Sequence, residues 1–165
     1  MALRIEGPGP VFYRQVRVGH RGRPFTLWKF RSMVPDAEAS AGVQWAVPGD
    51  TRITRVGRLL RRTRLDEAPQ FWNVLRGQMS MVGPRPERPE FVDQLASVIP
   101  LYRLRHAVRP GLTGWAQVKA PYAATEAEAL TKLEYDLYYL RNQSHYLDLL
   151  VIAKTVWVVL GLKGR

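Results

Sequence analysis

The chain has no cysteine, and this absence excludes disulfide bridges and metal sites built on thiolates. Its three histidines, His20, His106 and His145, lie far apart and lack the spacing of metal ligands. No Gly-rich loop ends in Gly-Lys-Ser or Gly-Lys-Thr, and there is no Gly-x-Gly-x-x-Gly fingerprint for a dinucleotide. Because the histidines lack the spacing of metal ligands, each is predicted to be an ordinary polar residue rather than a catalyst.

Long apolar runs are missing as well. No stretch reaches the roughly 20 apolar residues that a membrane-spanning helix needs. The longest candidate, Leu147–Leu162, is interrupted by Asp148 and Lys154. Met1–Pro10 has no apolar core, so the N-terminus does not look like a signal peptide. These features exclude a multispanning protein, but not a globular protein that touches a membrane.

Acidic residues are scarce, with 14 Asp and Glu against 25 Lys and Arg, which gives a formal net charge of +11. Such a charge favours phosphates, nucleic acid or an anionic membrane surface as partners. Most of the basic residues are arginines, which bind phosphate through a rigid two-pronged fork. The 165 residues, 46% of them hydrophobic, suffice for one modest core, so a single domain over Met1–Arg165 is predicted.

The residue pattern predicts an α+β fold that is mostly helical, with an N-terminal β-hairpin. Val11–Val18 and Phe25–Phe30 are rich in β-branched and aromatic residues and flank a turn with two glycines, as in a hairpin. The loop Arg109–Trp115 is expected to enter a strand at Gln117 and Val118. The sequence favours helices over Thr51–Arg62, Glu87–Ser97, Pro100–Val108, Thr125–Gln143 and Tyr146–Leu162.

An acidic pair, Asp66 and Glu67, directly follows the densest run of arginines in the chain. Thr63 with Asp66 fits a capping box, which would place the pair near the start of a helix that runs to Arg76. The positive end of that helix and the preceding arginines would hold Asp66 ionised, as a nucleophile or a ligand of a hard cation requires. From spacing alone, a simple helix cap paired with nearby arginines is the commoner outcome.

Several cations lie where they could bind phosphate. Lys29 and Arg31 are two residues apart on a predicted strand and would share one face, although spacing alone favours a solvated edge. Arg85 stands between two prolines, whose restricted backbone would either hold its guanidinium for an anion or form a structural turn. Arg109 precedes a loop with two glycines, which in most proteins is only a turn.

Two predicted helices have faces suited to a membrane surface. Thr51–Arg62 gathers arginines on one side, so it could lie on an anionic membrane, bind a nucleic-acid backbone or cover the core with a charged face. Tyr146–Leu162 is too apolar for an ordinary surface helix and too short for a span, so it either packs on the core or lies in a lipid interface. In the helix between them, Asp136 is four residues after Lys132 and could do no more than pair with it at the surface.

Four blocks resemble the bacterial sugar transferase family: KFRSM, TRLDEAPQFWNVLRGQMSMVGPRPE, RPGLTGWAQV and YDLYYL. These are the monotopic polyprenyl-phosphate phosphoglycosyl transferases, including the catalytic domains of undecaprenyl-phosphate glucose or galactose phosphotransferases. The blocks stand in the family's order, and the resemblance extends from Val11 through the last helix. The stretch GPRPERPEF looks closest to members that serve exopolysaccharide synthesis.

The resemblance implies an enzyme that moves a sugar-1-phosphate from a UDP-sugar to a polyprenyl phosphate such as undecaprenyl phosphate, releasing UMP. It would act on the cytoplasmic face of the bacterial inner membrane, in the first membrane step of exopolysaccharide, O-antigen (lipopolysaccharide) or glycoconjugate synthesis. In the family the Asp of the acidic pair forms a covalent phosphosugar intermediate and the Glu holds Mg²⁺, which implies these roles for Asp66 and Glu67. Asp136 would be a further polar site residue. The implied phosphate-binding residues are Lys29, Arg31, Arg61, Arg85 and Arg109.

The implied chemistry agrees with the residues present. A diphosphate resists attack by a carboxylate unless its charge is neutralised, and Mg²⁺ with arginines does that. An enzyme of this kind is not expected to bind nucleic acid. The alternatives to the enzyme are a basic nucleic-acid-binding module and a non-catalytic membrane-surface scaffold. Family members usually carry a membrane-inserted segment before the start that GPVFYRQ resembles. Because Met1–Pro10 is not apolar, we expect an excised or shortened catalytic domain.

Overall fold

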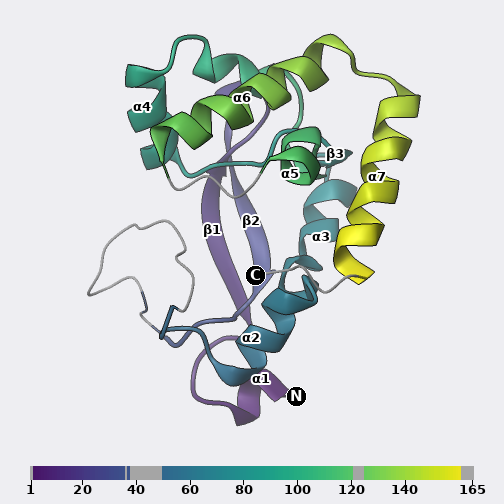
Figure 1. The fold of residues 1–165 in the computed structure, drawn as a ribbon. Coiled ribbons are helices and arrows are strands. Elements are labelled where there is room, and N and C mark those ends of the chain that lie inside the picture. Colours follow the sequence, from purple (N-terminus) through teal and green to yellow (C-terminus); the bar gives the residue numbers. More distant parts are fainter. Residues whose placement is uncertain (1, 36, 38–49, 121–124, 161–165) are drawn as a thin grey trace.

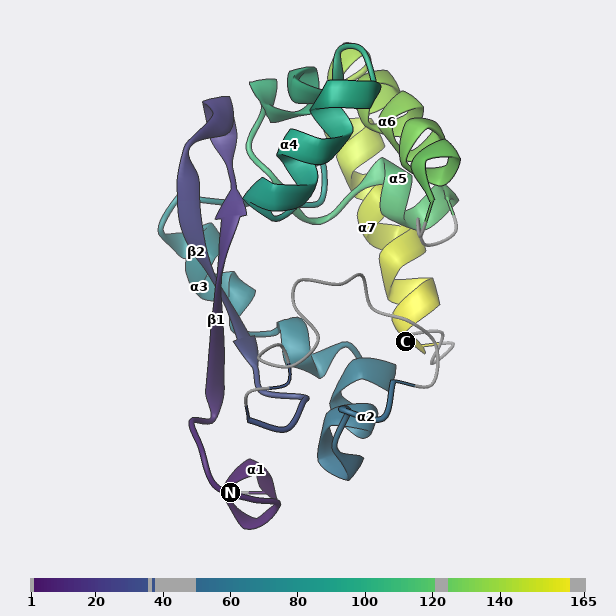
Figure 2. The same cartoon turned by 90° about the vertical axis from the view of Figure 1, so that its left-hand side faces the viewer.

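A long β-hairpin runs along one side of the molecule, and helices pack against it (Figures 1 and 2). The computed structural model describes residues 2–35, 37, 50–120 and 125–160. The strands are β1 (Phe12–Val18), β2 (Pro24–Phe30), β3 (Ser80–Val82) and β4 (Gly111–Thr113). The helices are α1 (Ala2–Ile5), α2 (Arg55–Arg62), α3 (Gln70–Leu75), α4 (Pro89–Val98), α5 (Trp115–Lys119), α6 (Glu126–Arg141) and α7 (His145–Leu160). Short 3₁₀ segments cover His20–Gly22, Leu65–Glu67 and Tyr102–Ala107.

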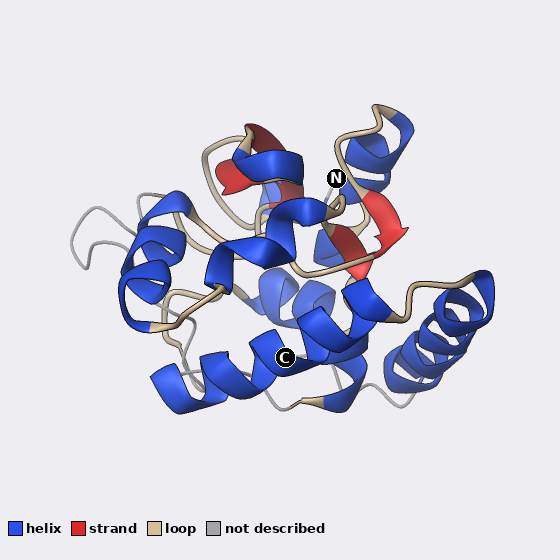
Figure 3. Ribbon diagram, turned by 90° about the horizontal axis from the view of Figure 1, so that it is seen from above, coloured by secondary structure: helices blue, strands red, loops and turns tan. Residues whose placement is uncertain are grey.

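Helices lie at both ends of the hairpin, and α3 lies beside β2 (Figure 2). Two perpendicular views place α4 and α6 near one end and α1 and α2 near the other (Figures 1 and 2). Seen from above, most of the described chain is helical and strand is confined to short segments (Figure 3). The predicted α+β class, mostly helical with an N-terminal hairpin, is confirmed. None of the described helices is both long enough and apolar enough to cross a membrane.

The hairpin is antiparallel and pairs β1 with β2 from Phe12 opposite Phe30 to Val18 opposite Pro24. Aromatic side chains pack on one of its faces, since the ring of Phe12 stacks on that of Phe30 with centroids 5.4 Å apart. The same ring meets Trp28 edge-on at 6.1 Å. Cross-strand aromatic pairs of this kind stabilise a sheet, so the local sequence accounts for this element.

Two apolar clusters form the core. One lies between β1, α4 and α6 and contains Val18, Leu95, Ile99, Tyr102 and Leu133, among others. The second lies beneath α7 and contains Val82, Tyr139, Leu147 and Val151. The last helix therefore packs on the core with one face, while its other face leaves Tyr146, Leu149, Val156 and Trp157 exposed.

The helix α6 begins as predicted. The Thr125 hydroxyl accepts a hydrogen bond from the Glu128 amide at 3.3 Å, and the Glu128 carboxylate accepts one from the Thr125 amide at 2.9 Å. This reciprocal pair is a capping box, which depends only on residues three apart.

Other predicted boundaries are wrong. Gln117 and Val118 lie in the helix α5 rather than in a strand, and the extended residues are Gly111–Thr113, which pair in parallel with β3. The predicted helix over Pro100–Val108 is a 3₁₀ segment that begins after Leu101, whose φ of 63° lies in the left-handed region. Both segments are set by packing against distant parts of the chain, which local propensity does not record.

Candidate active site

The acidic pair lies in a tight 3₁₀ turn between two helices. Helix α2 ends at Arg62 with Thr63 as its C-terminal cap, and the Thr63 hydroxyl donates back to the Leu59 carbonyl at 2.8 Å. Arg64 then takes a left-handed conformation with φ of 57° and turns the chain into Leu65–Glu67. The predicted capping box is therefore wrong, because Thr63 ends the preceding helix instead of starting the next one.

Glu67 is buried and surrounded by cations. Lys29 Nζ lies 3.3 Å from its Oε1, Arg85 Nη2 donates to the same oxygen, and Arg64 Nη1 lies 3.8 Å from Oε2. Burial alone would raise the pKa of Glu67, but the charges of Arg85 and Lys29 outweigh it and hold this pKa well below its usual value of 4.5. Glu67 is therefore ionised at neutral pH.

Asp66 has the opposite environment. Its side chain is buried, and no hydrogen bond or ion pair to its carboxylate occurs within the described parts of the chain. Burial raises the pKa of Asp66, with the charge of Lys29 acting against this shift and the neighbouring Glu67 adding to it. The expected stabilisation of the ionised form by a helix end is absent, since Asp66 lies in a 3₁₀ turn, and burial is the largest influence on its pKa while Lys29, Arg61 and Arg85 oppose the rise. Neighbouring carboxyls with opposite pKa shifts are typical of catalytic pairs.

Lys29 reaches Glu67 because α3 fixes the second strand of the hairpin. The Asn73 side chain, fully buried in α3, accepts from the Trp28 amide at 3.2 Å and donates to the Thr26 carbonyl at 2.7 Å. It also donates to the Gln78 side chain at 2.7 Å. Sequence reasoning missed Asn73, and the only available signal was a polar residue among apolar ones in a short helix.

Arg85 reaches Glu67 from a loop that is packed backbone against backbone. The Gly83 amide donates to the Thr113 carbonyl and the Gly111 amide to the Pro84 carbonyl, both at 2.9 Å. A Cβ atom at Gly111 would lie only 2.1 Å from the Gly83 nitrogen, so this approach requires glycine. The blocks GPRP and RPGLTGW, nearly 30 residues apart along the chain, are thus neighbours in space.

Of the other predicted phosphate ligands, Arg61 lies near the acidic pair, whereas Arg31 contacts the backbone near the N-terminus. Arg61 Nε donates to the Ser32 hydroxyl at 2.8 Å, and its charge opposes the rise in the pKa of Asp66. The Arg31 guanidinium instead donates to backbone carbonyls near the N-terminus: Leu3 at 2.6 Å, Gly7 at 3.0 Å and Pro8. Lys29 and Arg31 therefore do not form a joint clamp.

Arg109 and Asp136 do not contact the acidic pair. Arg109 is exposed at the start of the loop beside Gly83. Asp136 is almost fully buried, and its Oδ2 accepts from Arg105 Nε at 3.0 Å and Nη2 at 2.7 Å. The predicted surface pair with Lys132 is wrong, because the Lys132 ammonium contacts Glu87 at 2.7 Å. Sequence reasoning missed both Arg105 and Glu87.

The acidic pair offers donors that suit magnesium. Mg²⁺ in enzymes is commonly held by one or two carboxylates, with substrate phosphates and water completing the shell. Asp66 and Glu67 supply such oxygens, and the low pKa keeps Glu67 charged. The described residues contain no cluster of three or more His, Asp or Glu that could enclose a metal alone. The fit to magnesium therefore depends on ligands from a phosphate-bearing substrate.

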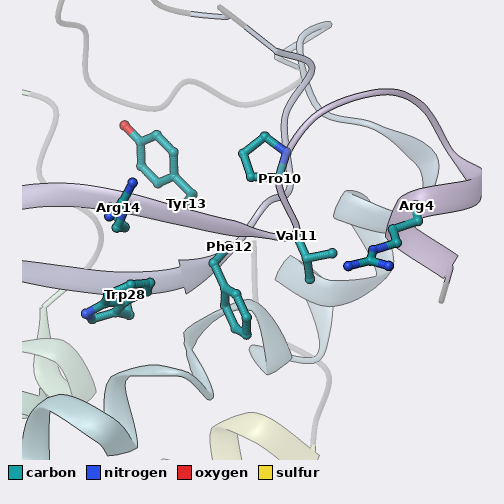
Figure 4. A pocket seen from close by; sticks show the side chains of 7 residues that line it. All are labelled: Arg4, Pro10, Val11, Phe12, Tyr13, Arg14 and Trp28. Carbon is teal, nitrogen blue, oxygen red and sulfur yellow. The ribbon is translucent and has the colours of Figure 1, made fainter.

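A surface hollow lies elsewhere, at the N-terminal end of β1 (Figure 4). Its volume is about 770 Å³, and Arg14 lies 5.5 Å from the Trp28 ring on its wall. Neither Asp66 nor Glu67 lines it. The lining residues are Arg4, Pro10, Val11, Phe12, Tyr13, Arg14 and Trp28.

Several known proteins have similar sequences, and two of the three described here are named for transfer to undecaprenyl phosphate. An N-acetylgalactosaminephosphotransferase of Aeromonas hydrophila, acting on UDP-N-acetylgalactosamine and undecaprenyl phosphate, is 50% identical over 96% of this chain and 37% of its own length. A UDP-glucose:undecaprenyl-phosphate glucose-1-phosphate transferase of Escherichia coli (strain K12) is 45% identical over 95% of the chain and 34% of its own. An exopolysaccharide production protein of Rhizobium leguminosarum bv. phaseoli is 40% identical over 94% of this chain and 80% of its own length.

The chain spans about a third of the length of the first two relatives, at 37% and 34%. The match to the family itself is nearly complete. The profile described as bacterial sugar transferase matches residues 1–162. With the acidic pair, the GPRP loop and the RPGLTGW loop gathered at one place, the chain belongs to the bacterial sugar transferase family.

Proposed function

We propose that this chain is the catalytic domain of a phosphoglycosyl transferase that moves a sugar-1-phosphate from a UDP-sugar to a polyprenyl phosphate. One observation carries the proposal. Among the residues that the structure describes, no ion pair reaches Asp66, while the adjacent Glu67 is held by Lys29 and Arg85. A buried carboxylate without a fixed partner beside a cationic cluster can attack phosphorus when the substrate's own charge is neutralised.

In the first half-reaction, a carboxylate oxygen of Asp66 attacks the phosphorus that carries the sugar. The bond from this phosphorus to the bridging oxygen breaks, and UMP leaves with the electron pair. The product is an acyl phosphate between Asp66 and the sugar. Arg61 and Lys29, whose charges already act on Asp66, would stabilise the negative charge that develops on the phosphoryl oxygens.

In the second half-reaction, an oxygen of the polyprenyl phosphate attacks the same phosphorus. The bond to Asp66 breaks, which restores the carboxylate and yields a polyprenyl diphosphate sugar. A covalent intermediate lets a nucleotide donor and a lipid acceptor use one cationic site in turn. A site that binds phosphate on both occasions needs only one set of arginines.

Glu67, together with phosphate oxygens of the donor, would hold Mg²⁺. The ion would supply charge neutralisation on the diphosphate and so make it accessible to an anionic nucleophile. Lys29 and Arg85 share one oxygen of Glu67, while Arg64 lies 3.8 Å from the other, so this second oxygen is the better candidate for the metal.

The acidic pair is carried by elements that also present apolar side chains to solvent. Those on α2, the 3₁₀ turn and α3 are Leu59, Leu65, Phe71, Trp72 and Leu75. Arg76 stacks over the Trp72 ring at 4.9 Å. Exposed apolar residues next to arginines suit an anionic membrane surface. We propose that this face contacts the cytoplasmic side of the inner membrane, where a polyprenyl phosphate would enter.

The names of the relatives suggest which donors to try. UDP-N-acetylgalactosamine and UDP-glucose head the panel, because the relatives are named for those sugars. The chain, with Mg²⁺ and undecaprenyl phosphate in bilayer nanodiscs, should release UMP from at least one of them. Absence of UMP with every common UDP-sugar would contradict the proposal. Steep salt-dependent binding of nucleic acid together with that absence would favour the binding-module alternative.

A further inference from the structure

The segment Gly83–Glu87 is anchored along its whole backbone. The flanking contacts of Gly83 and Pro84 with β4 hold one end. At the other end, Arg17 Nη1 donates to the Pro86 carbonyl at 3.0 Å, and the Val18 amide donates to the Glu87 carbonyl at 2.9 Å. The middle carbonyl, that of Arg85, accepts from Arg105 Nη2 at 3.0 Å. The residue that contacts Glu67 is thus itself held by a second arginine.

Arg105 is built into the interior. Its side chain is only 2% exposed, and it serves three acceptors: the Asp136 carboxylate, the Tyr102 hydroxyl and the Arg85 carbonyl. Burial opposes its charge, but the carboxylate of Asp136 outweighs this effect and raises the pKa of Arg105 above its ordinary value. Asp136 therefore orients the guanidinium and keeps it charged, while Arg105 delivers one N–H to the loop.

We propose that Arg105 is a positioning residue that aligns the Arg85 guanidinium on Glu67. This inference rests on the proposed function and adds a role for Arg105 and a role for Asp136. Asp136 acts through Arg105 and Arg85 rather than by touching the substrate, and the chain of contacts runs from the helix α6 to the acidic pair. A misplacement of about 1 Å at a reacting group can reduce turnover about 100-fold.

A buried Arg–Asp pair can also serve only the stability of the fold. The hydrogen bond from Arg105 to the Arg85 carbonyl distinguishes this structural role from a positioning role. Replacing such a pair by apolar residues of similar size commonly leaves stability unchanged or improved. The double variant Arg105→Met/Asp136→Leu should therefore fold, yet it has no donor for the Arg85 carbonyl. We expect its turnover to fall about 10- to 100-fold, with a smaller change in KM for the UDP-sugar.

A double-mutant comparison tests whether Arg105 acts through Arg85. In an Arg85→Met background, introducing Arg105→Met/Asp136→Leu should lower turnover by less than about threefold, because the group being aligned is already absent. Arg105→Lys, which keeps the charge beside Asp136 but lacks the planar fork, should recover only part of the activity. Leu133→Ala is the matched control: it removes a buried core residue of α6 without touching the loop, and should keep near wild-type turnover when folded.

A second readout does not depend on activity. Glu67→Gln should destabilise the wild-type fold more than it destabilises the Arg105→Met/Asp136→Leu background, because Arg85 is no longer aligned on Glu67 there. The positioning role would be overturned if Glu67→Gln lowered the stability to urea equally in both backgrounds. It would also be overturned if Arg105→Met/Asp136→Leu lowered turnover as much in the Arg85→Met background as in the wild type. Failure of the wild-type chain to release UMP, with the unfolding coupling present, would instead overturn the proposed function and leave the positioning role supported.

Discussion

The ammonium of Lys29 lies 3.3 Å from the carboxylate of Glu67, although 38 positions separate the two residues along the chain. This contact joins the hairpin to the 3₁₀ turn and brings the block KFRSM to the acidic pair. Lys29 is partly buried, with 18% of its side chain exposed, and this burial lowers its pKa while Glu67 raises it. The mutual dependence of these two charges makes the site sensitive to single substitutions.

Replacing Glu67 by Gln should destabilise the fold by about 3 kcal/mol at neutral pH, because two partly buried cations, Lys29 and Arg85, lose a buried counter-charge. The pKa of Glu67 is lowered, so its contribution is present above its ordinary pKa of 4.5 and is lost as the pH falls below it. The difference between wild type and variant should therefore shrink in acid, as measured by urea unfolding. Asp93→Asn, at an exposed ion pair with Arg103, is the control and should change stability by less than ~1 kcal/mol. A difference that does not vary with pH would contradict the assignment.

Asp66→Asn should abolish transfer without harming the fold. Because burial raises the pKa of Asp66, its ionised form is disfavoured in the folded state, and a neutral isostere should be equally or more stable at neutral pH. Intact-mass spectrometry after incubation with the UDP-sugar should show a phosphosugar adduct on the wild-type chain only. An adduct on the folded Asn variant would exclude Asp66 as the nucleophile.

His106 should make the fold less stable as the solution is acidified. Burial and the nearby charges of Arg105 and Arg103 lower its pKa from 6.5 to about 4. The unfolded chain therefore binds a proton that the folded chain rejects, and stability falls as the pH decreases from 6.5 towards 4. His106→Asn should remove this component of the pH dependence in urea unfolding. His145→Asn, at the exposed start of α7, is the control for the substitution itself.

Gly111→Ala should separate the two loops that meet beside the acidic pair. The added Cβ would lie 2.1 Å from backbone at Gly83, so the main chain must move, and we expect a loss of about 3 kcal/mol or more with little remaining turnover. Gly22→Ala provides the comparison, since its φ of 75° is unfavourable for alanine but no atom lies within 4 Å of the new Cβ. This control should cost about 1 kcal/mol and leave turnover unchanged. Equal effects at both positions would argue against the loop contact.

The exposed apolar face beside the acidic pair should bind anionic vesicles. Trp72→Ser/Leu75→Ser removes two of its exposed side chains and should weaken vesicle binding about 10-fold or more. Val98→Ser/Leu101→Ser, on exposed apolar residues of α4 and the loop after it, is the matched control. Co-sedimentation with phosphatidylglycerol vesicles would measure both. Equal binding by the two variants would place the membrane contact elsewhere.

Local patterns were sufficient where an element depends on its own residues. Alternating β-branched and aromatic residues predicted the hairpin, and the spacing of Thr125 and Glu128 predicted the start of α6. The same logic failed at Thr63, where a capping-box pattern occurs but the hydroxyl bonds back into the preceding helix. It failed again at Asp136, because the side chain turns inward to Arg105 instead of outward to Lys132.

The sequence by itself determined the fold class, the family and the pair Asp66 and Glu67, because short blocks and periodicity carry that information. Only the tertiary structure decided which cations meet the pair. It brought Lys29 and Arg85 to Glu67, directed Arg31 to the N-terminal backbone, and placed Arg105 behind Arg85. The physical reason is that charge pairing in the interior depends on distance and burial in space, and both are set by contacts between residues far apart in the chain.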